Sequence, residues 1–125
     1  MTATQEAKDC AIIAAQAAAD NLATNIVAID VSSHLPFADV FIICSANNER
    51  QLRAVIDNVE EKLLEAGHKR LHREGSGSDD WVLIGFPDVV VHAFLKEARD
   101  YYRLESLWSD CPQIGLPVLT GGDPS

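Results

Sequence analysis

Two strand-forming segments joined by only two residues constrain the fold of this chain more than any other feature. Residues 81–86 and 89–95 are rich in β-branched and aromatic residues, and Pro87-Asp88 between them predicts a tight hairpin. Because side chains alternate along a strand, the hairpin has two faces. One face is wholly apolar and suits a core: Val82, Ile84, Phe86, Val89, Val91 and Ala93. The other is mixed, and by elimination it is the better candidate for an exposed patch: Trp81, Leu83, Gly85, Val90, His92 and Phe94.

Two other segments have the patterns of helices. The clearest starts at Asn48, which has Gln51 at capping distance, and Gly67 stands where a C-terminal stop is expected. Its apolar stripe recurs at helical spacing: Leu52, Val55, Ile56, Val59 and Leu63. The Ala-rich segment 3–22, with Thr2 and Gln5 at capping-box spacing, predicts a second helix that packs closely through small side chains.

The rest of the chain predicts further short strands and one more helix. Residues 26–31 and 40–44 read as strands, residues 68–72 as a short basic strand, and residues 97–108 as mostly helical. A chain of 125 residues and 13.6 kDa is long enough for one core but not for two. The order of elements therefore predicts a single-domain α/β fold, with a mixed β-sheet covered by helices on at least one face.

Charge and cysteine content narrow the function classes. Ten Lys and Arg against nineteen Asp and Glu give a net charge of −9, which disfavours nucleic acid and anionic membranes and favours basic partners. Cys10, Cys44 and Cys111 form no C-x-x-C pair, which predicts reduced thiols. The chain has no signal-peptide pattern and no apolar run near the ~18 residues of a membrane span. We therefore expect a cytoplasmic protein with no membrane and no specific nucleic-acid partner.

Motifs for catalysis, cofactors and metals are missing from the sequence. There is no P-loop and no Gly-rich dinucleotide fingerprint. His68 and His72 have a spacing that binds metal on a helix, but a strand would separate them by ~13 Å. Cys44 ends an apolar run, which blunts a thiol. We therefore expect no catalytic residue, no cofactor and no metal.

One near-match to an enzyme motif fails at a single position. Nucleotidyltransferases place a Gly-Ser turn ahead of a strand with Asp-x-[Asp/Glu], whose two carboxylates hold divalent ions. Gly75-Ser76 precedes Asp88 here, but Val90 occupies the second carboxylate position. Asp30 has Ser32 in the corresponding place. A single carboxylate cannot hold the paired ions that clamp a transferring phosphoryl group, so a scaffold of this kind would lack its chemistry.

The mixed hairpin face is the remaining candidate for function. Exposed Trp, His and Phe with a charged and aromatic rim are typical of the centre of a protein interface. The candidate interface residues are Glu74, Trp81, Leu83, Asp88, Val90, His92, Phe94, Arg99 and Tyr102. Two alternatives stay open: Trp81 could be a core residue, and His92 a strand histidine that is hydrogen-bonded to a neighbour.

Several short motifs, in order along the chain, resemble one known family. They include Ile29-Asp30-Val31-Ser32, Asn48-Glu-Arg-Gln51, Asp88-Val-Val-Val-His-Ala-Phe94 and Leu104-Glu-Ser-Leu-Trp108. The last two are the most specific, and together the matching stretches span residues 6–112. On these residues the chain resembles the ribosomal silencing factors of the RsfS/Iojap family.

This resemblance implies a fold, a partner and a mode of action. It implies an α/β domain over residues 1–112, similar to nucleotidyltransferases but without their catalysis. Residues 113–125 lie outside the family pattern and are rich in Pro and Gly, so we expect a flexible tail there. The resemblance further implies a non-enzymatic homodimer that binds the large ribosomal subunit through its uL14-type protein. Binding there would block joining of the small subunit and repress translation under nutrient limitation. The alternative is a degenerate nucleotidyltransferase that uses Asp30 or Asp88 and binds nucleotide and divalent metal.

Overall fold

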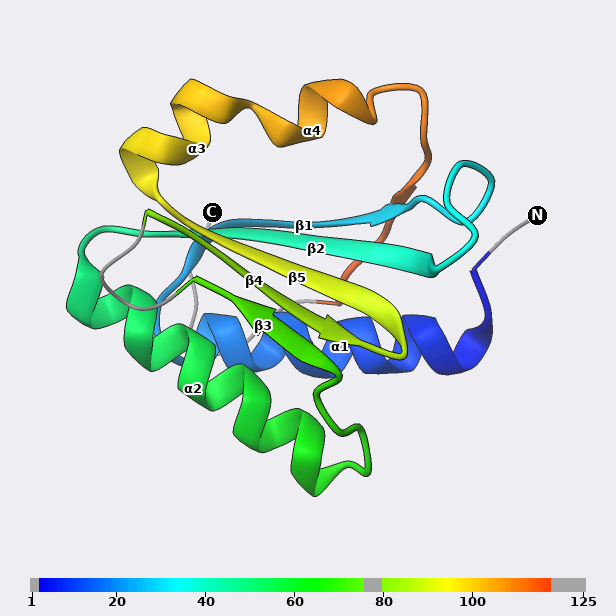
Figure 1. Ribbon diagram of the computed structural model, residues 1–125, viewed down its shortest axis with the longest axis horizontal. Coiled ribbons are helices and arrows are strands. Elements are labelled where there is room, and N and C mark those ends of the chain that lie inside the picture. Colours follow the sequence, from blue (N-terminus) through cyan, green and yellow to red (C-terminus); the bar gives the residue numbers. More distant parts are fainter. Residues whose placement is uncertain (1–2, 76–79, 118–125) are drawn as a thin grey trace.

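A mixed six-stranded sheet carries helices on both of its faces (Figure 1). The computed structural model describes residues 3–75 and 80–117. The strand order is β3-β4-β5-β2-β1-β6; α1 and α2 lie against one face, and α3 and α4 against the other. The elements are α1 (Gln5–Asp20), β1 (Thr24–Asp30), β2 (Ala38–Ala46), α2 (Glu49–Glu65), β3 (His72–Glu74), β4 (Trp81–Phe86), β5 (Asp88–Leu95), α3 (Lys96–Tyr102), α4 (Leu104–Leu107) and β6 (Gln113–Ile114). The predicted α/β class with a mixed sheet is confirmed.

The hairpin predicted from Pro87-Asp88 forms the middle of the sheet. β4 and β5 pair antiparallel with Trp81 opposite Phe94 and Phe86 opposite Val89. Asp88 takes a left-handed φ of 66°, which Asp tolerates better than most side chains. β5 then pairs parallel with β2, and β2 pairs antiparallel with β1. The parallel pairing of β5 with β2 therefore places the hairpin beside β2 and β1.

The wholly apolar hairpin face is buried under α1 and α2, as predicted. Its six residues belong to one core cluster, together with the alanines of α1 and the apolar stripe of α2. The Asn48 side chain caps α2 by accepting from the backbone N–H of Gln51 at 2.8 Å. The cap of α1 is Thr4, whose Oγ1 accepts from the N–H of Ala7 at 3.1 Å; the predicted cap, Thr2, lies outside the described residues.

Most element boundaries shift from the prediction by one or two residues, and three elements differ more. The basic segment 68–72 contributes only its last residue to a strand, because the chain is still reversing at the end of α2: Gly67 has φ 92° and the N–H of His68 bonds to the carbonyl of Leu63 at 2.7 Å. The predicted helix 97–108 is broken in two at Arg103, whose φ is 49°. Gln113 and Ile114, placed in the predicted tail, pair with β1 as β6.

The second face of the sheet is covered in part by α3 and α4 (Figure 1). A separate core cluster lies there, and it includes Ile43, Val90, Phe94 and Leu104. No helix in the described ranges is long and apolar enough to cross a membrane. The mixed hairpin face is therefore buried in part under α3 and α4 and accessible in part. The candidate site lies at the edge of these two helices.

Candidate functional site

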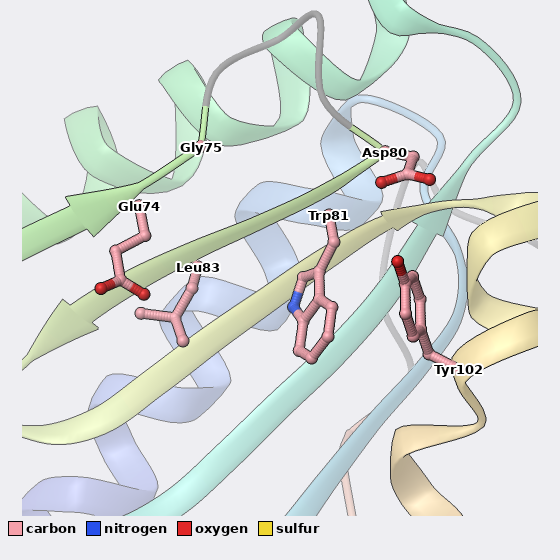
Figure 2. Close-up of a pocket in the computed structure, with 6 residues that line it drawn as sticks. All are labelled: Glu74, Gly75, Asp80, Trp81, Leu83 and Tyr102. Atoms are coloured by element: carbon pink, nitrogen blue, oxygen red, sulfur yellow. The ribbon is translucent and has the colours of Figure 1, made fainter.

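An open groove lies at the edge of α3, over the start of the hairpin (Figure 2). Its volume is about 430 Å³, and its lining residues are Glu74, Gly75, Asp80, Trp81, Leu83 and Tyr102. Trp81 and Leu83 point into it from β4, and Tyr102 faces them from the end of α3 (Figure 2). Glu74 and Asp80 add carboxylates to the rim. The groove thus has an apolar and aromatic floor with an acidic edge.

The floor of the groove is held by ring stacking. Trp81 stacks on Phe94 with the ring centroids 4.8 Å apart, and Tyr102 lies 5.0 Å from Trp81. Phe94 is fully buried, whereas Tyr102 is 46% exposed. Such contacts stabilise aromatic pairs by ~0.5–1.5 kcal/mol beyond burial alone. The rings of Trp81 and Tyr102 are therefore held in place within the fold.

The aromatic contacts continue across the sheet beyond the groove. Phe41 on β2 lies 4.6 Å from the His92 ring and 5.4 Å from that of Trp108, which follows α4. Sequence reasoning did not select Phe41 or Trp108 as site residues. The parallel register sets Phe41 beside Val90 on this face, and Trp108 reaches the same face from the end of α4. Knowledge that β2 pairs parallel with β5 would have placed Phe41 on this face. The sequence of neither strand indicates which strand it pairs with.

The nine predicted interface residues divide into accessible and buried groups. Glu74, Asp88 and Tyr102 are exposed and Trp81 and Leu83 are partly buried, whereas Val90, His92, Phe94 and Arg99 are buried. The expectation that the whole mixed face is exposed is wrong, because α3 and α4 pack over its centre. Asp88 lies at the other end of the hairpin from Trp81, ~17 Å away along β4, so it does not join the groove.

Arg99 is an anchor within the fold. Its side chain is 8% exposed; Nη1 donates to the carbonyl of Asn25 and, at 2.9 Å, to Oγ of Ser45. Nε donates to the carboxylate of Glu105 at 3.3 Å. These bonds join α3 to β1, β2 and α4. Arg99 therefore holds α3 and α4 against the sheet beside the groove.

His92 is a neutral strand residue that is hydrogen-bonded to a neighbour. This is one of the two alternatives that the sequence left open. Trp81 Nε1 donates to its Nδ1 at 3.2 Å. Burial lowers the pKa of His92 to about 4, so the ring is uncharged at neutral pH. Nδ1 is an acceptor, so Nε2 carries the proton, and Nε2 has no hydrogen-bond partner among the residues that the structure describes. The role of His92 here is to orient Trp81.

The buried thiols are poor nucleophiles. Burial raises the pKa of Cys44 to about 12, and burial with the nearby carboxylates of Glu6 and Asp88 raises the pKa of Cys10 to about 12. A thiol that stays protonated at neutral pH reacts slowly. The blunted thiol predicted for Cys44 agrees with this environment.

The two aspartates of the failed enzyme motif do not form a metal pair. The carboxylate of Asp30 accepts from the N–H of Ala3 at 2.9 Å and from the N–H and Oγ of Ser32 at 3.0 and 2.6 Å. Asp30 on β1 and Asp88 on β5 lie at the same end of the sheet with β2 between them, which separates the two backbones by ~10 Å. Ser76 of the Gly-Ser turn lies outside the described residues.

A family model described as "Ribosomal silencing factor during starvation" matches residues 4–124. The chain belongs to the RsfS family. The family resemblance in the sequence motifs is thereby confirmed.

Named relatives and solved structures agree with this membership. The chain is 40% identical over 104 residues to the ribosomal silencing factor RsfS of Bacillus subtilis, covering 83% of this chain and 88% of that one. It is 34% identical to the chloroplastic protein Iojap of Zea mays, covering 88% of this chain and 48% of that one. A crystal structure of a Chromobacterium violaceum protein matches with a TM-score of 0.79 at 31% identity, covering 91% and 96% of the two chains. Another, from Bacillus halodurans, matches with a TM-score of 0.75 at 35% identity, covering 90% and 100%.

Proposed function

We propose that this RsfS-family chain silences ribosomes by occupying a surface, with no catalytic step. It binds the large subunit through its uL14-type protein and sterically blocks joining of the small subunit, which represses translation under nutrient limitation. Family membership supports the ribosome as the partner. The observation that carries the binding mode is the groove of fixed aromatic side chains with an acidic edge.

The groove has the physical properties of a protein-binding centre. Trp and Tyr are the residues in which interface binding energy concentrates, because large rigid rings bury much area with little loss of conformational entropy. Trp81 is fixed by Phe94 and by the hydrogen bond to His92, so it loses little freedom on binding. Glu74 and Asp80 suit a basic partner, as does the net charge of −9. Of the predicted interface residues, Trp81, Leu83, Tyr102 and Glu74 contact the partner, and the buried ones support them.

Binding to purified uL14 tests this proposal. Trp81→Ala and Tyr102→Ala should each weaken binding by roughly 30-fold or more, the loss typical of a truncated central anchor. Leu64→Ala is the matched control, since Leu64 is 61% exposed on α2 at the opposite face of the sheet. Circular dichroism establishes that each variant is folded. Unchanged affinity in both groove variants would place the interface elsewhere.

We also propose that the free chain is a homodimer, as expected from the family resemblance. Large apolar side chains remain exposed on α3 and α4, among them Tyr101 at 81% and Leu107 at 72%. A second copy covering them would remove this apolar area from water. Sedimentation equilibrium should give twice the chain mass. A monomer at tens of micromolar would contradict the proposal.

The competing function is a degenerate nucleotidyltransferase. It requires two carboxylates that share a pair of ions. The Asp30 carboxylate is instead engaged by backbone N–H groups and by Ser32, and its backbone lies ~10 Å from that of Asp88 across β2. Calorimetry with nucleoside triphosphates and Mg²⁺ decides the question. We expect no heat of binding, and stoichiometric binding that Asp88→Asn abolishes would favour the enzyme instead.

A further inference from the structure

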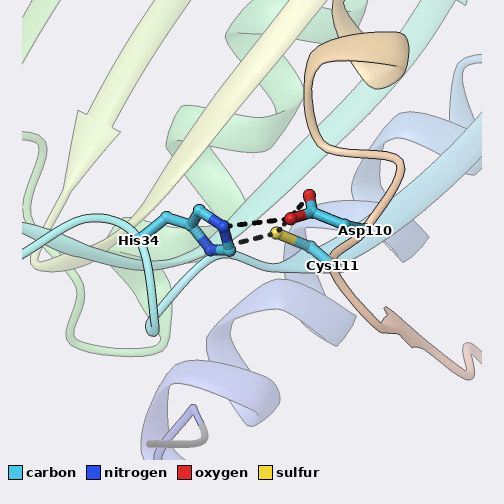
Figure 3. A group of neighbouring side chains, drawn as sticks. All are labelled: His34, Asp110 and Cys111. Atoms are coloured by element: carbon cyan, nitrogen blue, oxygen red, sulfur yellow. Dashed lines mark hydrogen bonds and ion pairs between the residues drawn. The ribbon is translucent and has the colours of Figure 1, made fainter.

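Three metal-ligating side chains meet on the second face of the sheet, outside the groove (Figure 3). His34 comes from the loop between β1 and β2, and Asp110 and Cys111 come from the connection between α4 and β6. His34 Nε2 lies 3.3 Å from Asp110 Oδ2, and Cys111 Sγ lies 3.5 Å from His34 Nδ1 and 3.9 Å from Asp110 Oδ1. Residues 76 positions apart in the sequence thus bring imidazole, carboxylate and thiol together.

The three side chains come close to the spacing of one face of a tetrahedral metal site, although the two short contacts of His34 use different ring nitrogens, Nε2 toward Asp110 and Nδ1 toward Cys111. With Zn–S near ~2.3 Å and Zn–N or Zn–O near ~2.0–2.1 Å, tetrahedral ligand atoms stand ~3.3–3.7 Å apart. One ligand atom from each residue can be chosen so that all lie within 4.8 Å of one another. Because one ion takes only one of the two ring nitrogens, the exposed side chains of Asp110 and His34 must rotate to bring the ligand atoms from within 4.8 Å to that spacing.

The backbone on both sides of the cluster is already fixed. The N–H groups of His34 and Leu35 bond to the carbonyl of Val31 at 3.0 Å, which folds the loop back on itself. The N–H of Cys111 bonds to the carbonyl of Trp108 at 2.9 Å, and the N–H of Asp30 bonds to that of Pro112 at 2.9 Å. Little further ordering is needed to bind an ion, which favours affinity.

The electrostatic surroundings favour a cation. The carboxylates of Asp110 and Asp30 lie near the Cys111 thiol and present negative charge to the cluster. A bound divalent ion would offset this negative charge and would deprotonate the thiol that coordinates it.

We propose that His34, Asp110 and Cys111 bind one divalent transition-metal ion of the zinc class. Thiolate and imidazole select zinc-like ions over Mg²⁺ and Ca²⁺, which prefer all-oxygen sites. His34 and Asp110 are exposed, so a fourth position is open to water or to a partner's ligand. The ion clamps the β1–β2 loop to the connection after α4. His34 also packs edge-on against Trp108 with the ring centroids 5.9 Å apart, so the clamp supports the aromatic side chains of this face.

Cobalt(II) titration of the full chain tests the site, because a cobalt–thiolate bond gives a charge-transfer band and tetrahedral cobalt gives intense visible bands. We expect both bands to saturate at one equivalent and to disappear when zinc is added. Cys111→Ser should remove the charge-transfer band, and His34→Gln should weaken binding at least ~10-fold. The matched controls, Cys10→Ser and His68→Gln, should bind as the unaltered chain does.

A second readout keeps the proposal testable if a spectrum is weak. Zinc should raise the melting temperature of the unaltered chain and leave that of Cys111→Ser unchanged, because binding only to the folded state stabilises it. The absence of a cobalt–thiolate band at saturating cobalt would overturn the proposal. Equal binding by Cys111→Ser would do the same, since the ion would then sit elsewhere.

Discussion

Replacing Arg99 with Met should loosen the packing of α3 and α4 on the sheet, while the core under α1 and α2 stays intact. Met approximates the aliphatic part of the side chain but removes every donor of the guanidinium group. The lost bonds run to the carbonyl of Asn25, to Ser45 and to Glu105. The change therefore tests whether Arg99 is a structural anchor.

The expected loss follows from these three partners. A hydrogen bond to a charged group contributes ~1.5–3 kcal/mol when it is buried, and Ser45 is 2% exposed. The Glu105 side chain is 38% exposed, so water screens its share of the interaction. Taken together, the free energy of unfolding should fall by about 3 kcal/mol. For a domain of this size that lowers the melting temperature by ~10 °C.

Urea unfolding followed by tryptophan fluorescence measures this directly, because Trp81 and Trp108 both lie on the affected face. Arg99→Lys keeps the charge but loses the fork of donors and should recover only part of the stability. Arg53→Met, at an exposed position on α2, should change stability by less than ~0.5 kcal/mol. An equally small effect of Arg99→Met would refute the anchoring role of Arg99.

Three further predictions concern single residues. Because the pKa of His92 is lowered to about 4 in the folded state, only the unfolded state binds this proton between pH 6.5 and about 4. The free energy of unfolding should therefore fall by about 3 kcal/mol as the pH drops through that window. His92→Phe should flatten this slope in urea titrations at several pH values; parallel slopes would show that His92 is not buried as a neutral ring. Asp30→Ala leaves the N–H groups of Ala3 and Ser32 without their acceptor and should lower the free energy of unfolding by about 2 kcal/mol, whereas no change by thermal melting would contradict a structural role. Cys10 and Cys44 should resist a thiol reagent at pH 8 until the chain unfolds, and rapid labelling of the folded protein would contradict their burial.

Local patterns were sufficient to predict most of the fold. The apolar stripe from Leu52 to Leu63 lies on the buried side of α2, and the hairpin turns at Pro87-Asp88. These features depend on residues close in sequence, whose periodicity and turn chemistry are visible directly. The strand predicted at 68–72 starts only at His72, because the chain is still reversing at the end of α2. The helix predicted at 97–108 breaks at Arg103, which has a left-handed φ. Hydrophobic periodicity reports neither feature.

The site was harder to predict because it depends on contacts between distant segments. Trp81 and Tyr102 were correctly selected as neighbours. The burial of His92, Phe94 and Arg99 could not be foreseen, since it depends on how α3 and α4 fold back over the sheet. His34 and Cys111 come together through contacts between distant segments, among them the pairing of the two-residue strand β6 with β1, which no sequence pattern marks.

We propose that this chain acts as a steric block on the large subunit. Sucrose-gradient sedimentation of purified ribosomal subunits, mixed under conditions that permit joining, tests it most directly. With saturating protein the subunits should sediment separately and the chain should travel with the large one, while the Trp81→Ala variant should leave joining unaffected. Normal formation of joined ribosomes in the presence of saturating unaltered chain would contradict the account.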